Sequence, residues 1–503
     1  MALINSVISW VIKKRIHQIE LFIKYPIDVQ NDLLLKLITE AQDTEWGKKY
    51  DYNNINNYDD YKNRVPVNTY DDLKPYINRL IKGEQNLLWP EKIKWFAKSS
   101  GTTSDKSKFI PISQQALEEC HFKGGKDLLA IYCNNNTDTY IFDGKGLAIG
   151  GSRQFFEVNN DAFYGDLSAI IIENLPFWAE FHRTPELDIA LMDEWESKIQ
   201  KIAETTINDN VTNILGVPSW TLILLKKILE ISGKKHISEV WPALEMFAHG
   251  GISFKPYKEQ FKEIINKDIK YIETYNASEG FFGIQDRNNT DDMLLMLDYG
   301  IFYEFIKPED AGKAFPDTYT LEQVETGKNY AILISTNAGL WRYLIGDTIK
   351  FTSLNPFRIH ITGRTKNYIN AFGEELIIDN AERALQIACE KTNAIINEYT
   401  AAPVYFSKNK AGAHEWLIEF ITAPANIQFF AEVLDNALKT INSDYEAKRY
   451  RDLILSQPII RSLPKQTFYK WFKQKGKLGG QHKVPRLNND RVFLEEIFKI
   501  ANL

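Results

Sequence analysis

Residues 98–111 read K-S-S-G-T-T-S-D-K-S-K-F-I-P and form the most informative segment of the chain. The segment is rich in Ser, Thr and Lys, and apolar runs precede it at Ile93–Ala97 and close it at Phe109–Ile112. A polar loop between two strands offers backbone N–H groups, hydroxyls and ammonium groups, which suit a polyphosphate. Gly101 would let the backbone approach an anion closely. We interpret the segment as a phosphate-binding loop, with a solvated polar hairpin as the alternative.

The loop is not of the Walker type. The order G-x-x-x-x-G-K-[ST] is missing, and a strand rather than a helix is expected to follow. A helix N-terminus would therefore not face the phosphates, and the donors must come from the loop itself.

Length and composition narrow the class of protein. The chain has 503 residues, of which 44% are hydrophobic and 25% charged, enough for a large core and more than one domain. A net charge of -6 shows no basic bias and argues against nucleic acid as a partner. No run reaches the ~18 apolar residues of a membrane span, so no membrane partner is expected. Three cysteines without metal spacing indicate a cytoplasmic location.

Helix and strand patterns in the first part of the chain predict sheets flanked by helices. Amphipathic helices are expected at 3–24 and 31–42, followed by a polar connection to about residue 70. Ser113 is expected to cap a helix that ends near Tyr132. Short strands dominate from 271 to 362, and we interpret residues 294–306 as a hairpin around Asp298-Tyr299-Gly300.

A smaller α/β unit is predicted after residue 363. Its expected helices cover about 379–391 and 427–441, and its strands lie near Val404 and at 416–421. The fold class is therefore α/β, with a large N-terminal domain, residues 1–363, and a small mobile C-terminal domain, residues 367–503.

Polar residues recur at the ends of the predicted strands, at Glu279, Asp347, Arg364 and late in the chain at Lys483. Together they supply what the formation of an adenylate from ATP requires. Glu279 is a suitable ligand for Mg²⁺, and Asp347 can accept two hydrogen bonds from a ribose diol. Arg364 or Lys483 can supply the positive charge that the transition state needs.

Five short segments occur in an order that resembles a known family. They are S-S-G-T-T-S (99–104), Y-N-A-S-E-G (275–280), W-R-Y-L-I-G-D (341–347), T-G-R-T-K (362–366) and Q-H-K-V-P-R (481–486). Along essentially its whole length the chain resembles the Gretchen Hagen acyl-acid amido synthetases, the bacterial members most of all. These belong to the adenylate-forming superfamily, with firefly luciferase and the acyl-CoA ligases. The resemblance implies that ATP and Mg²⁺ convert a small carboxylic acid to its acyl-adenylate, which the amine of an amino acid then attacks.

The resemblance also implies roles for single residues. The phosphate loop is matched by Ser99, Ser100, Gly101, Thr102 and Thr103, and the adenine-side turn by Asn276, Ala277 and Ser278. Asp347 matches the carboxylate that binds the ribose. The catalytic set is the Mg²⁺-facing acid, the arginine ahead of the hinge and the mobile lysine of the small domain, matched by Glu279, Arg364 and Lys483.

Two departures from the family pattern stand out. Asp105 occupies a position where the superfamily usually has Gly, and the last segment lacks the form P-K-T-x-x-G-K.

Two alternative functions remain: a ligase that forms a thioester with coenzyme A, and a nucleotide-binding module without turnover. We expect the acid to bind between the helix 114–131 and the segment 152–178, whose aromatic residues suit a flat or compact apolar acid (Phe155, Phe156, Phe177 and Trp178). We expect the small domain to swing about residues 365–367.

Overall fold

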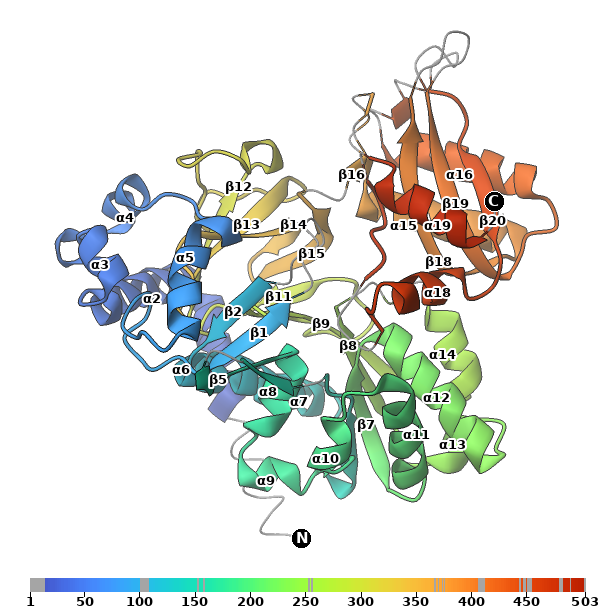
Figure 1. Ribbon diagram of the computed structural model, residues 1–503, viewed down its shortest axis with the longest axis horizontal. Coiled ribbons are helices and arrows are strands. Elements are labelled where there is room, and N and C mark those ends of the chain that lie inside the picture. The colour runs from blue at the N-terminus through green and yellow to red at the C-terminus, as the bar shows by residue number, and fades with distance from the viewer. Residues whose placement is uncertain are drawn as a thin grey trace. The chain divides into compact units, whose positions relative to one another are not determined.

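The computed structural model describes residues 14–99, 108–151, 153–156, 159–251, 254, 257–365, 368–369, 371–372, 374, 376–405, 412–442, 445–446, 449, 455–478, 483–488 and 490–501. The chain divides into two compact units (Figure 1). Unit 1 comprises residues up to 252, 260–345 and 349–360, and unit 2 comprises 253–259, 346–348 and 361–503. The boundary expected from the sequence, at 363–367, stays a prediction.

The largest element of the fold is a mixed sheet of 11 strands with the order β12-β13-β14-β15-β11-β10-β9-β8-β7-β3-β6. The strands have the bounds β3 Lys145–Ala148, β6 Arg183–Thr184, β7 Val211–Gly216, β8 Met246–Gly250, β9 Lys270–Ala277, β10 Gly280–Ile284, β11 Met293–Leu295, β12 Ile301–Ile306, β13 Asn329–Thr336, β14 Tyr343–Leu354 and β15 Phe357–Arg364. Strands β6, β3, β7, β8 and β9 are parallel to one another. Their carboxyl ends therefore share one edge of the sheet.

A second sheet in unit 1 contains the two strands that flank the candidate phosphate loop. Its order is β2-β1-β5-β4, with β1 Trp95–Ser99, β2 Lys108–Ile112, β4 Arg153–Phe156 and β5 Asn159–Gly165. Strands β1 and β2 are antiparallel and pair Ser99 with Lys108, as the polar segment between two apolar runs predicted. The predicted cap is also present, because the Ser113 side chain accepts a hydrogen bond from the backbone N–H of Ala116. The helix that follows contains a π-helical turn, Leu117–Phe122, between α6 Gln114–Ala116 and α7 Lys123–Asn135.

Residues 14–24 are helical. The α-helices that follow in the first 269 residues are α2 Pro26–Ala41, α3 Glu45–Lys49, α4 Tyr58–Arg64, α5 Tyr70–Ile81, α8 Leu167–Glu173, α9 Phe177–Glu180, α10 Leu187–Ala190, α11 Trp195–Thr206, α12 Pro218–Ser232, α13 Ile237–Val240 and α14 Lys258–Ile265. The expectation of an irregular connection up to residue 70 was wrong, because α3 and α4 lie within it. Both helices are too short to show an apolar period, but each has an N-cap: the side chains of Thr44 and Asn57 accept hydrogen bonds from the N–H groups of Gly47 and Asp60.

The predicted hairpin at 294–306 was also wrong. Strand β11 pairs with β10 and β15, whereas β12 pairs with β13. Strands β13, β14 and β15 lie between β11 and β12 in the sheet, so the turn at Gly300, whose φ is 69°, carries the chain across them. The turn residues were recognised correctly, but a turn signal does not specify which neighbour each strand takes.

Unit 2 contains the predicted smaller α/β arrangement. Its main sheet has the order β18-β19-β20, with β18 Ile395–Val404, β19 Ala413–Thr422 and β20 Ile459–Leu463, and a two-stranded sheet pairs β16 Tyr368–Ile369 with β17 Leu376–Ile377. The helices are α15 Ile378–Thr392, α16 Ile427–Ile441, α18 Thr467–Gln474 and α19 Val492–Ala501. One apolar core joins α15 and α16 to the sheet through residues such as Leu385, Leu434 and Trp416. Among the described residues no helix is long and apolar enough to cross a membrane.

Candidate active site

The carboxyl ends of the parallel strands bring glycine-rich turns to one edge of the large sheet. Strands β7 and β8 end at Gly216 and Gly250, which lie near one another because β7 pairs with β8 up to Gly216 and His249. In sheets of parallel strands, ligands bind outside this edge. It is therefore the place in unit 1 where a nucleotide is expected.

The predicted adenine-side turn stands at this edge. Asn276 and Ala277 end β9, Ser278 is buried in the turn, and Glu279 is half-buried just before β10 begins. A Cβ atom on Gly250 would lie 2.5 Å from the carbonyl oxygen of Thr274 and 3.3 Å from Asn276 Oδ1. The glycine therefore allows the end of β8 to pack closely against this turn.

Glu279 is the candidate metal ligand. The described residues contain no group of three or more His, Cys, Asp or Glu side chains that could hold a metal ion. Such a donor set fits Mg²⁺ bound mainly by phosphate oxygens and water, because Mg²⁺ commonly takes only one or two carboxylates from the protein.

The candidate phosphate loop is described only at its base. Ser99 ends β1, whereas Ser100, Gly101, Thr102, Thr103 and Asp105 lie outside the described residues. The base is well fixed: the N–H of Phe109 donates to Tyr70 Oη at 2.9 Å, and Lys98 Nζ lies 5.8 Å from the centre of the Tyr164 ring. The side chains of the expected acid-binding aromatics, Phe155, Phe156, Phe177 and Trp178, are likewise outside the description.

Asp347 and Arg364 form an ion pair in unit 2. Arg364 Nε lies 2.8 Å from Asp347 Oδ1, and the two side chains are 31% and 17% exposed. The N–H of Thr365 donates to the carbonyl of Gly346 at 2.8 Å, which holds the two strand ends together. The sequence suggested two separate roles for these residues, and the structure adds that the guanidinium orients the carboxylate.

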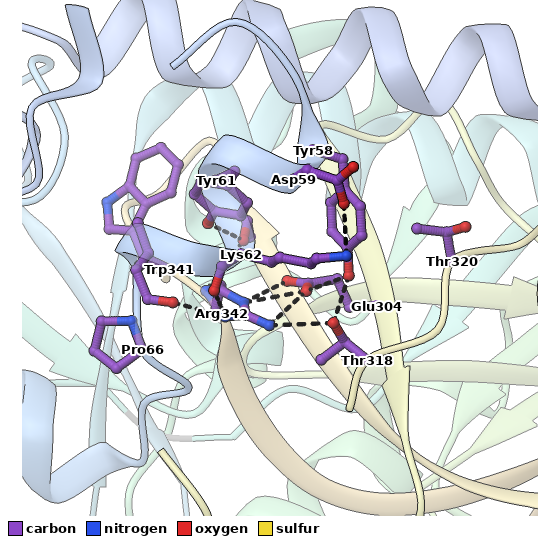
Figure 2. Close-up of polar contacts among 12 residues, drawn as sticks. Tyr58, Asp59, Tyr61, Lys62, Pro66, Glu304, Thr318, Thr320, Trp341 and Arg342 are labelled. Atoms are coloured by element: carbon purple, nitrogen blue, oxygen red, sulfur yellow. Dashed lines mark hydrogen bonds and ion pairs between the residues drawn. The ribbon is translucent and has the colours of Figure 1, made fainter. Parts of the chain in front are cut away.

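Arg342, in the segment W-R-Y-L-I-G-D, has a role that sequence reasoning missed (Figure 2). Its guanidinium is 1% exposed and lies against the fully buried carboxylate of Glu304, with Nη2 2.9 Å from Oε1 and Nε 3.0 Å from Oε2. Nη1 donates to the carbonyls of Lys62 and Val65 at 2.8 and 2.6 Å, and Tyr58 Oη donates to Glu304 at 2.9 Å. Arg342 therefore joins strands β12 and β14 to the region of α4 within unit 1.

Lys198 is a second missed residue, on α11. Its Nζ donates to the carbonyls of Gly150, Gly151 and Met192 at 2.6, 2.9 and 3.2 Å, which fixes the turn after β3 at the carboxyl edge. Burial lowers the pKa of Lys198 to about 8, and Asp166 and Asp193 oppose that shift. A lone Lys in an amphipathic helix gives no sequence signal of this kind.

Lys483 belongs to unit 2 and is exposed. The residues that follow it, Val484 to Asn488, are buried in the same unit. The lysine therefore stands at the point where the chain enters the small domain's packed interior.

Comparison with known proteins supplies the family. The large mixed sheet, together with the separate α/β unit, has the fold of the adenylate-forming enzymes. Residues 15–269 match the GH3 family N-terminal domain, residues 294–364 the GH3 family central domain, and residues 379–492 the GH3 family C-terminal domain. The chain belongs to the GH3 family.

Several relatives share little sequence identity with the chain but align with most of its length. Indole-3-acetic acid-amido synthetase GH3.3 of Arabidopsis thaliana is 23% identical, with 91% of this chain and 89% of the relative covered. The structure of the GH3.15 acyl acid amido synthetase in complex with 2,4-DB is similar, with a TM-score of 0.78 at 17% identity and coverage of 94% and 93%. The structure of 2-hydroxyisobutyryl-CoA ligase in complex with 2-HIB-AMP has a TM-score of 0.59 at 13% identity and coverage of 94% and 92%. The predicted family, fold class and ligase activity are confirmed.

Proposed function

We propose that the protein is an ATP-dependent acyl-acid amido synthetase. In the first step a carboxylate oxygen attacks the α-phosphorus of ATP, which forms an acyl-adenylate and releases pyrophosphate. In the second step the amine of an amino acid attacks the acyl carbonyl, which forms an amide and releases AMP. One observation carries this proposal. Asp347 and Arg364, which the sequence analysis assigned to two different parts of the nucleotide chemistry, form an ion pair, and the chain belongs to the GH3 family.

We assign the adenine to the turn Asn276–Ser278, the ribose hydroxyls to Asp347, and the phosphates to the loop Ser99–Thr103. Asp347 is suited to the ribose because a carboxylate accepts charge-assisted hydrogen bonds from hydroxyl groups, and Arg364 Nε, 2.8 Å from Oδ1, helps to fix its orientation. Hydroxyl and backbone N–H groups of this Ser- and Thr-rich loop can donate hydrogen bonds to the oxygens of the triphosphate.

Glu279 would hold Mg²⁺ beside the phosphates. The ion, when bound, neutralises phosphate charge and orients the leaving pyrophosphate. Glu279 serves this purpose because it is half-buried at the end of the turn, where a carboxylate is fixed but still accessible.

Lys483 and Arg364 would supply positive charge during adenylation. Adenylation needs a cation near the α-phosphate, whereas amide formation needs space for an amine at the same carbonyl. A lid that moves about Thr365 and the two residues after it serves both steps, since hinge motion of a few linker residues is a common solution. Lys483 would then act in the first step only.

We assign a small, flat or compact apolar acid to the region between the helix that begins at Gln114 and residues 152–178. The names of two relatives support an acid of this kind, because indole-3-acetic acid and 2,4-DB are small acids with aromatic rings. The acceptor is an amino acid by the same comparison. We place the enzyme in the cytoplasm, where the free thiols of Cys120, Cys133 and Cys389 remain reduced.

The test is to incubate the enzyme with ATP, Mg²⁺ and a panel of carboxylic acids, and to measure ATP–pyrophosphate exchange. An active acid is then combined with glutamate, aspartate or coenzyme A, and the products are identified by mass spectrometry. An amide and AMP support the proposal. A thioester would make the protein an acyl-CoA ligase, and no exchange or AMP with any mixture would make it a nucleotide-binding module.

A further inference from the structure

The segment after Lys483 is attached to the small domain as an additional short strand. The N–H of Ala401, on β18, donates to the carbonyl of Arg486 at 2.8 Å, and the N–H of Asn488 donates back to the carbonyl of Ala401 at 3.1 Å. Ala401 and Leu487 form a parallel bridge. The backbone of this segment is therefore fixed against the sheet that forms the core of unit 2.

Side chains strengthen the same attachment. Thr400 Oγ1 donates to the carbonyl of Pro485 at 2.6 Å, and Asn488 Nδ2 donates to that carbonyl at 3.2 Å. Both residues are buried. A buried carbonyl with two donors keeps Pro485, two positions after Lys483, in one place.

Arg486 adds an ion pair and a contact with an aromatic ring. Its guanidinium nitrogen Nη1 lies 2.7 Å from Glu398 Oε1, and its guanidinium carbon lies 4.5 Å from the centre of the Tyr399 ring. The side chains of Arg486 and Glu398 are 11% and 15% exposed. Glu398 Oε1 also accepts from the N–H of Tyr399 at 3.0 Å, so the carboxylate itself is fixed to β18.

We propose that Arg486, through its ion pair with Glu398 and its contact with the Tyr399 ring, positions Lys483 for adenylation. The inference rests on the proposed role of Lys483. Lys483 has a long side chain whose charge acts at a distance from its backbone, so a shift of the backbone moves the ammonium group. Misplacement of a catalytic group by about 1 Å can reduce a rate about 100-fold. The buried ion pair acts three residues away from the lysine and touches neither substrate nor reacting atoms.

A buried arginine in the same unit offers a matched control. Arg449 donates to both carboxylate oxygens of Asp435, on α16, at 2.6 and 2.8 Å, and to the carbonyl of Leu455 at 2.7 Å. Its side chain is 6% exposed. Replacing Arg449 with Met removes a buried ion pair of the same kind without changing the contacts of residues 484–488.

The experiment compares the full-length variants Arg486→Met, Arg486→Lys, Arg449→Met and Lys483→Ala. Each is assayed for ATP–pyrophosphate exchange with an active acid and, separately, for amide formation from a chemically prepared acyl-adenylate. Arg486→Met is expected to lower kcat for exchange about 10- to 100-fold, with amide formation within about twofold of wild type. Arg486→Lys, which keeps the charge, should recover part of the loss. Amide formation is also the check that Arg486→Met has folded, and if it has not, the same comparison is made with Arg486→Lys.

A double-mutant cycle distinguishes positioning from general damage. If Arg486 acts through Lys483, Arg486→Met lowers exchange further by less than about twofold in a Lys483→Ala background. If Arg449→Met has any effect, it is expected to reduce both half-reactions equally. The same result for an Arg486 variant overturns the inference. If Lys483→Ala itself leaves exchange unchanged, the role of Lys483 in the proposed function fails and the inference fails with it. If exchange depends on Lys483 but not on Arg486, only the inference is overturned.

Discussion

Replacing Arg342 with Met is expected to destabilise unit 1 strongly. The substitution removes the cationic partner of Glu304 and leaves that carboxylate fully buried, with Tyr58 Oη as a remaining donor. It also leaves the carbonyls of Lys62 and Val65 without the donor that they now share. Removing one member of a buried ion pair costs about 3–5 kcal/mol, because the other charge stays desolvated. We therefore expect the free energy of unfolding to fall by about that amount.

The measurement is urea denaturation, with the free energy of unfolding taken from midpoint and slope. Two further variants separate the causes. Glu304→Leu combined with Arg342→Met removes both charges and should recover most of the loss, since apolar replacements of a buried pair are often neutral. Lys62→Met breaks the ion pair with Asp59, which is 2.6 Å long but 35% and 75% exposed, and should change stability by less than about 1 kcal/mol. A loss of less than about 1 kcal/mol for Arg342→Met, or a double variant no more stable than the single one, would refute the reasoning.

Three other substitutions test the candidate site. Asp347→Asn should raise KM for ATP about 10- to 100-fold in pyrophosphate exchange, because it weakens charge-assisted hydrogen bonds to the ribose; an unchanged KM would contradict the assignment. Glu279→Gln should lower exchange about 100-fold at limiting Mg²⁺, and equal rates across a Mg²⁺ titration would exclude the metal role. Burial lowers the pKa of Lys198 to about 8, below the unfolded value, so the unfolded state binds more protons from about pH 8 to about pH 10.4 and stability rises with pH there. Lys198→Met should remove this rise in unfolding measurements, and the same pH dependence in both proteins would contradict it.

Local patterns in the sequence predicted much of the fold. The strands around residues 98–111, the cap at Ser113 and the helices α15 and α16 of the small domain follow from periodicity, N-cap chemistry and turn residues, whereas α18 and α19 were not predicted. The order of five short sequence motifs along the chain predicted the family. Each motif alone is weak evidence for a family, but the five motifs in this order are specific. These features depend on residues that are close in the sequence.

What could not be predicted depends on residues that are far apart. Glu304 and Arg342 are separated by 38 positions, and only the arrangement of β12 and β14 brings them together. The same is true of Asp347 and Arg364, whose contact depends on the start of β14 lying beside the end of β15. The false hairpin at 294–306 has this cause as well, since strand pairing is decided by the whole sheet.

Transfer of oxygen-18 tests the central claim most directly. A carboxylic acid that supports exchange is labelled with oxygen-18 in its carboxyl group and incubated with ATP, Mg²⁺, an amino acid and the enzyme. If an acyl-adenylate forms, a carboxyl oxygen becomes the bridge to phosphorus and leaves with AMP when the amine attacks. The account predicts one labelled oxygen in the AMP and one in the amide. Unlabelled AMP, with the label in another phosphate product, would contradict it.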